Sequence, residues 1–164
     1  MLDIQVLTAD DWPLWRELRL VALAEAPFAF GSRLADWQGD GDREQRWRDR
    51  IGLPGSYNVV GLLDGRPVGM ASGVPADRAA QVELISMWVS PAARGRGVGE
   101  ALVEDVTRWA RAAGAESVRL SVMPGNAAAR ALYERLGFRF TSELGDPLPD
   151  GAGHELIMER PLPR

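Results

Sequence analysis

One stretch of the chain determines the expected fold class and chemistry: Val82-Glu83-Leu84-Ile85-Ser86-Met87-Trp88-Val89-Ser90-Pro91-Ala92-Ala93-Arg94-Gly95-Arg96-Gly97-Val98-Gly99-Glu100-Ala101. Its first eight residues are rich in β-forming side chains and predict a strand. Apolar residues then recur at helical spacing over 97–113 and stop before Gly114, which predicts a helix. A glycine-rich turn therefore joins a strand to a helix.

This turn predicts a phosphate or pyrophosphate site. The first amides of a helix have no acceptor within the helix, and the helix dipole is positive at that end. The glycines at 95, 97 and 99 let an anion approach the backbone closely, while Arg94 and Arg96 add charge and hydrogen-bond donors. The alternative interpretation is a tight turn whose arginines are solvated.

Working outward, the flanking pattern predicts a single α/β domain over 1–164. Asp64-Gly65 between two β-rich runs is typical of a hairpin. The strand, helix and strand over 82–123 predict a right-handed parallel crossover. The mixed sheet, mostly antiparallel, is flanked by helices. The expected strands are 2–7, 57–63, 67–74, 82–89, 117–123, 138–142 and 154–160. The expected helices are 11–25, 43–51, 97–113 and 126–136. We expect a loop or short helix over 26–41 and a loop over 145–153.

Composition excludes several classes of protein. The 164 residues are 46% hydrophobic and 26% charged, as in soluble globular domains. The net charge of −4 argues against nucleic-acid binding, and no apolar run approaches the ~18 residues of a membrane span. We expect no signal peptide and a cytoplasmic location. The alanine-rich composition without lysine suggests a bacterial source.

The missing residue types exclude further chemistry. All 19 basic residues are arginine, which excludes a lysine Schiff base and a Walker-type phosphate loop. Without cysteine there is no thiolate nucleophile, and one histidine cannot form a multi-histidine metal site, so we expect no metal. The even spacing of the glycines departs from the G-x-G-x-x-G pattern of dinucleotide-binding folds.

Two motifs make the chain resemble the GNAT superfamily of N-acetyltransferases. The family pattern Q/R-x-x-G-x-G/A corresponds to residues 94–99, and A-x-x-x-Y-x-x-x-G-F corresponds to residues 129–138, preceded by Asn126. The resemblance covers about 57–160 and implies a sheet that splays between its fourth and fifth strands. It also implies acetyl-coenzyme A as co-substrate, a primary amine of a small molecule or peptide as acceptor, and a homodimer as a common assembly.

The resemblance assigns cofactor contacts residue by residue. Pantetheine would pair with the fourth strand at Met87, Trp88 and Val89, whose side chains are equally typical of a buried sheet. The Val89 amide is a candidate donor to the thioester oxygen. Asn126 is a candidate cofactor contact and equally a typical helix N-cap. The pyrophosphate would contact the strand-to-helix turn, made of Arg94, Gly95, Arg96, Gly97, Val98, Gly99 and Glu100.

Two residues are the catalytic candidates. Tyr133 matches the tyrosine that protonates the departing thiolate in many family members, and a phenol holds its proton at neutral pH. Glu83 lies where members with a glutamate base often have it. Strand alternation would place Glu83 on the same face as Met87 and Val89. The alternatives are a packed tyrosine and a solvated glutamate, a non-catalytic acetyl-coenzyme A sensor, or transfer of another acyl group.

Overall fold

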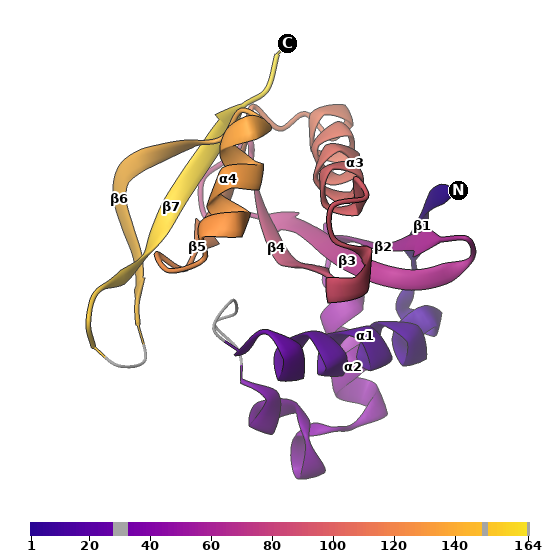
Figure 1. The fold of residues 1–164 in the computed structure, drawn as a ribbon. Coiled ribbons are helices and arrows are strands. Elements are labelled where there is room, and N and C mark those ends of the chain that lie inside the picture. Colours follow the sequence, from indigo (N-terminus) through magenta and orange to yellow (C-terminus); the bar gives the residue numbers. More distant parts are fainter. Residues whose placement is uncertain (28–32, 149–150, 164) are drawn as a thin grey trace.

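A computed structural model describes residues 1–27, 33–148 and 151–163, and all of its strands belong to one mixed sheet (Figure 1). The strand order is β1-β2-β3-β4-β5-β7-β6, in which β4 and β5 are parallel and the other neighbours are antiparallel. The strands are β1 (Leu2–Leu7), β2 (Tyr57–Leu63), β3 (Arg66–Pro75), β4 (Gln81–Val89), β5 (Ser117–Val122), β6 (Arg139–Pro147) and β7 (His154–Pro161).

Helices cover both faces of the sheet (Figure 1). One face packs on α3 (Val98–Ala112) and α4 (Ala127–Arg135) through a core that includes Leu102, Val106 and Phe138. The other face packs on α1 (Trp12–Glu25) and α2 (Glu44–Ile51) through a second core around Trp15 and Trp47. The predicted α/β class and its helix-flanked mixed sheet are therefore confirmed.

The sheet is splayed between β4 and β5, as predicted. The parallel pairing of these strands comprises Gln81 with Ser117, Val82 with Val118, and Glu83 with Arg119. From Leu84 onward β4 follows β3, whereas β5 follows β7. The edge of β4 that faces β5 is therefore open to another hydrogen-bonding partner.

A β-bulge interrupts β4 just after the splay begins. The register with β3 shifts between the pair Ser72–Ile85 and the pair Met70–Trp88, so β4 contains one extra residue. Ser86 lies in this interval with φ +55°, a value uncommon outside glycine. The extra residue reverses the alternation of side chains along the rest of β4.

Most predicted elements have the expected bounds. Asp64 and Gly65 have φ of +50° and +80°, as a two-residue hairpin turn requires. The clearest difference is β6, which extends to Pro147 into the segment 145–153 that was expected to be a loop. Short 3-10 turns at Leu34–Trp37 and Gly39–Gly41 occupy part of 26–41. Residues 28–32 and 149–150 of those two segments lie outside the described residues.

Candidate active site

A cavity of about 1360 Å³ occupies the splay between β4 and β5. It is bounded by the start of α3, by the loop from β5 to α4, and by one side of α4. Pro27, which follows α1, and Leu148, which follows β6, also line it. The cavity therefore has walls from α3 and α4 on one face of the sheet and from the end of α1 on the other. The predicted site residues that line it are Met87, Trp88, Val89, Arg94, Gly95, Gly97, Val98, Gly99, Glu100, Asn126 and Tyr133.

The start of α3 presents free backbone amides to this cavity. Gly97 is the N-cap residue and has φ +84°, a left-handed conformation that strains any other residue type. The first bond of the helix runs from the Ala101 amide to the Gly97 carbonyl, at 3.0 Å. The amides of residues 98–100 precede that bond and have no acceptor inside the helix. Together with the positive end of the helix dipole they suit a bound anion.

Arg94 is held across the cavity wall by two bonds. Its Nε donates to the Val89 carbonyl at 3.1 Å, and its Nη2 donates to Oε2 of Glu25 at 3.0 Å. The same Glu25 oxygen accepts the indole N–H of Trp88 at 2.9 Å. Glu25 thus ties the end of α1 to β4 and to the turn before α3. Glu25 cannot be recognised as a site residue from the sequence, because it is the last residue of an amphipathic helix far along the chain from the motif.

The Val89 amide points toward the splay. The Ser90 amide donates to the Val68 carbonyl of β3 at 2.7 Å, and the residue before it in a strand points its backbone groups the other way. The bond from Arg94 to the Val89 carbonyl agrees with that direction. The N–H and C=O of one strand residue share a side in an antiparallel ladder. The Val89 amide therefore faces the open edge.

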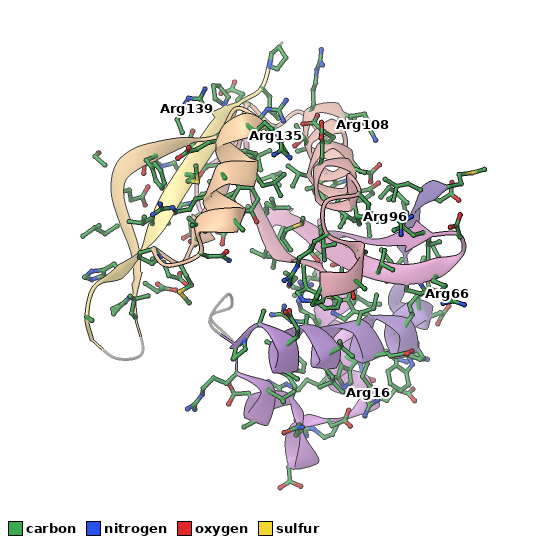
Figure 2. All side chains as sticks on the ribbon, viewed as in Figure 1. Arg16, Arg66, Arg96, Arg108, Arg135 and Arg139 are labelled. Atoms are coloured by element: carbon green, nitrogen blue, oxygen red, sulfur yellow. The ribbon has the colours of Figure 1, made fainter. Side chains whose placement is uncertain are left out.

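Arg96 is the one residue of the turn that does not line the cavity. Figure 2 shows its side chain on the side of the molecule where β2 and β3 meet their turn. The positive charge of Arg96 contributes there to lowering the pKa of Asp64, after the larger effects of the N-terminal ammonium. The cavity instead receives positive charge from Arg94 and from Arg135 of α4.

Tyr133 combines burial with access to the cavity. It is 7% exposed and packs edge-on against Phe138, with ring centroids 5.8 Å apart. None of the side-chain hydrogen bonds found among the described residues uses its hydroxyl. Burial raises the pKa of Tyr133 well above its ordinary value, so the phenol stays protonated at neutral pH. The packed interpretation of Tyr133 is therefore observed, and its role as proton donor stays a prediction.

Asn126 is the N-cap of α4, where its side-chain oxygen accepts the Ala129 amide at 3.2 Å. It also lines the cavity. The capping interpretation is thus observed, and a cofactor contact remains open to its amide nitrogen.

Glu83 does not share a face with Met87 and Val89, so the expected alternation is wrong. Val82 and Leu84 pack in the core beneath α3 together with Met87 and Val89. Glu83, between the first two, therefore faces the side of α1 and α2. The bulge at Ser86 causes the difference, because it shifts the alternation by one residue.

Glu83 does not line the cavity but pairs with Arg119 where the pairing of β4 and β5 ends, in an unusual electrostatic environment. Burial raises its pKa above the ordinary value, the Arg119 charge opposes the shift, and Asp77 and Asp146 add to it. Glu155 of β7 has its pKa raised by burial and by the charges of Asp146 and Glu83. A half-buried carboxylate with a raised pKa is a suitable proton acceptor near neutral pH.

Among the residues that the structure describes, no three His, Cys, Asp or Glu side chains gather into a group that could hold a metal ion. Within the same ranges, no helix has the length and apolarity needed to cross a membrane.

The sequence matches the acetyltransferase (GNAT) family over residues 15–138, and the chain belongs to that family. It is 37% identical to the N-acetylaspartate synthetase of Rattus norvegicus over 52% of this chain and 29% of that protein. It is 29% identical to the mycothiol acetyltransferase of Renibacterium salmoninarum over 78% of this chain and 37% of that protein. The chain thus spans well under half the length of these two relatives.

The fold also matches a solved structure over its whole length. The PaiA N-acetyltransferase of Thermoplasma acidophilum, in complex with coenzyme A, superposes with a TM-score of 0.77 and 16% identity. The match covers 99% of each chain. At that identity the likeness concerns the fold alone. Enzymes of this family use acetyl-coenzyme A, and the cavity here fits that group, since free amides and glycines meet an open strand edge within it.

Proposed function

We propose that this protein transfers an acetyl group from acetyl-coenzyme A to a primary amine by direct attack in a ternary complex. One observation carries the proposal: a single cavity joins the amides at the start of α3, the open edge of β4 and the buried Tyr133. The relatives' names support the same reaction class, because both name acetyl transfer or an acetylated product. A sensor would need the amides but not the tyrosine.

The two ends of the co-substrate would meet different parts of the cavity. The pyrophosphate would take hydrogen bonds from the amides of residues 98–100 and charge from Arg94. Pantetheine would pair with the free edge of β4, where the Val89 carbonyl is the acceptor that Arg94 now uses. Arg94 would therefore leave that carbonyl when the co-substrate binds.

Glu83 would begin the chemistry by accepting a proton from the protonated amine, directly or through water. The free amine then attacks the thioester carbonyl, so that a C–N bond forms and the C–S bond breaks. The Val89 amide donates to the oxygen that gains charge during attack. Tyr133 donates its proton to the departing thiolate, whose basicity is raised by burial in the same direction as that of the phenol. As the adduct collapses, its nitrogen gives its remaining extra proton to the Tyr133 oxygen. The products are the acetamide, coenzyme A and the proton that Glu83 then releases to solvent.

The test combines binding with turnover. Calorimetric titration of acetyl-coenzyme A into the folded protein should show binding, and a panel of primary amines should release coenzyme A thiol. Binding without thiol release from any amine would favour the sensor. Absence of binding at millimolar acetyl-coenzyme A would refute the proposal itself. Replacing acetyl- with propionyl- and succinyl-coenzyme A in the same assay tests the acyl group.

A further inference from the structure

Arg50, at the end of α2, reaches across to three strands of the sheet. Its Nη1 donates to Oδ1 of Asn58 at 3.2 Å, and its Nη2 donates to the hydroxyls of Ser72 and Ser86 at 3.1 Å each. Asn58 is 2% exposed and Ser72 is fully buried. All three acceptors are neutral. The guanidinium has five N–H donors, so two remain beyond these three bonds.

No carboxylate balances this charge in the part of the chain that the structure describes: none of the ion pairs there includes Arg50. Burial lowers the pKa of Arg50 to about 10, so it remains a cation at neutral pH. A second cation lies close by. The pKa of Arg19 on α1 is also lowered to about 10, first by burial and then by the Arg50 charge.

The structure gives this charge one favourable contact, the Trp15 ring, whose centroid lies 5.1 Å from the guanidinium carbon. A ring neutralises no charge, and the other partners, Asn58, Ser72 and Ser86, are neutral acceptors. A buried cation bound to neutral groups loses its hydration without gaining an ion pair. Charged side chains that are buried in this way are normally paired. The unpaired charge of Arg50 therefore destabilises the fold, and a bound anion would offset that effect.

The position of Arg50 connects it to the proposed reaction. Ser86, which it binds, is the bulge residue of β4 and directly precedes Met87 and Trp88 of the cavity wall. Glu83 lies on the same face of the sheet as Arg50. Ser72 pairs with Ile85 while Val74 pairs with Glu83, so Ser72, which Arg50 binds, is two residues along the ladder and one strand across it from Glu83. The backbone separation is about 8 Å. That span suits one small molecule with an amine at one end and an anion at the other.

We propose that the acceptor is a small amine that also carries a carboxylate, and that Arg50 binds the carboxylate while the amine lies toward Glu83. This inference rests on the proposed acetyl transfer and names the substrate class. A charge-assisted pair of this kind contributes selectivity, because an analogue without the negative charge leaves the buried cation unpaired. Arg50 is then a specificity-determining residue.

The experiment compares amino acids with their carboxamides. Initial rates of thiol release from acetyl-coenzyme A are measured with glycine, alanine, aspartate and glutamate, and with the α-carboxamide of each. We expect at least one acid to exceed its carboxamide by about 10- to 100-fold in kcat/KM. In Arg50→Gln that ratio should fall to about one through loss of the acid, with the Kd of acetyl-coenzyme A unchanged. Arg50→Lys should retain part of the preference.

Arg48→Gln is the matched control. Arg48 lies on the same helix but pairs with Asp10 and Glu44 at 3.0 Å each, so the selectivity should be that of the wild type. The inference is overturned if acids and carboxamides are used equally, if only amines without an anion release thiol, or if Arg50→Gln lowers both members of a pair alike. The absence of thiol release with every amine would instead contradict the proposed function. Melting curves verify that each variant is folded.

Discussion

Replacing Gly97 with glutamate should weaken the binding of acetyl-coenzyme A, and Gly114→Glu is the matched control. Both glycines have left-handed backbones, with φ of +84° and +89°, and an added Cβ at either would meet no atom within 4 Å. Their substitution therefore costs backbone strain rather than a clash. Gly97 begins α3 and lines the cavity, whereas Gly114 follows the end of α3 and does not line it.

Gly114→Glu should lose more stability than Gly97→Glu, although only Gly97→Glu should lose affinity for acetyl-coenzyme A. A left-handed non-glycine residue costs about 1–2 kcal/mol, part of which is offset by the lower entropy of the unfolded chain. The helix dipole then stabilises a carboxylate at position 97 and destabilises one at position 114, by about 0.3–1 kcal/mol each. Gly114→Glu should therefore melt lower, and each kcal/mol corresponds to about 2–4 °C in a domain of this size.

Binding should depend on where the charge lies. A carboxylate about 4 Å from a phosphate charge is repelled by about 1 kcal/mol in water and about 4 kcal/mol at an effective dielectric constant of 20. Calorimetric titration should therefore show at least about a 5-fold higher Kd for Gly97→Glu and an unchanged Kd for Gly114→Glu. Equal affinities in the two variants would refute the assignment of the pyrophosphate to the start of α3.

Four further outcomes are expected. Tyr133→Phe should lower kcat by about 100-fold or more with an unchanged Kd for acetyl-coenzyme A; Tyr57→Phe, which loses a 2.7 Å bond to Asp105, should instead lower the melting temperature and keep the activity. Because the pKa of Glu83 is raised, kcat/KM should fall as the pH drops through that raised value, and Glu83→Gln should remove this acid limb from the pH profile. Glu25→Gln removes the ion pair of Arg94 and should lower the Kd of acetyl-coenzyme A by about 2- to 5-fold. A higher Kd would mean instead that Glu25 positions Arg94 for the phosphate. Hydrogen bonds from Arg16 and Trp47 lower the pKa of Asp42 to about 2. The stability that the Asp42 carboxylate contributes should therefore be complete above about pH 4 and lost as the pH falls toward about 2. Melting temperatures of Asp42→Asn measured over the same pH range should lack that loss.

Local patterns were sufficient for the elements and for the start of α3. Apolar residues at helical spacing place the buried face of α3 correctly, and the Asp64-Gly65 pair gives the hairpin. The splay follows from the family resemblance and not from any local pattern. It depends on how far β4 and β5 pair, which is set by the whole sheet.

The features that the sequence does not predict are those created by tertiary contacts. Glu25 ends a helix and meets Arg94 only after the chain folds. Arg50 stands in a run of charged residues, over 43–50, that is typical of a solvated helix face. Its burial becomes apparent only when Asn58, Ser72 and Ser86 are seen beneath it. The bulge at Ser86 has no sequence pattern of its own, because serine rarely adopts a left-handed backbone.

That bulge explains how one strand contributes to both halves of the proposed reaction. Without the extra residue, side chains would alternate regularly, and Met87 and Val89 would lie on the same face as Glu83. With it, Met87 and Val89 pack beneath α3, and Trp88 turns toward α1 and meets Glu25. Ser86 is then free to bind Arg50 on the face that holds Glu83. The bulge thus separates the proposed co-substrate side of β4 from the proposed acceptor side, and the Val89 amide remains at the open edge between them.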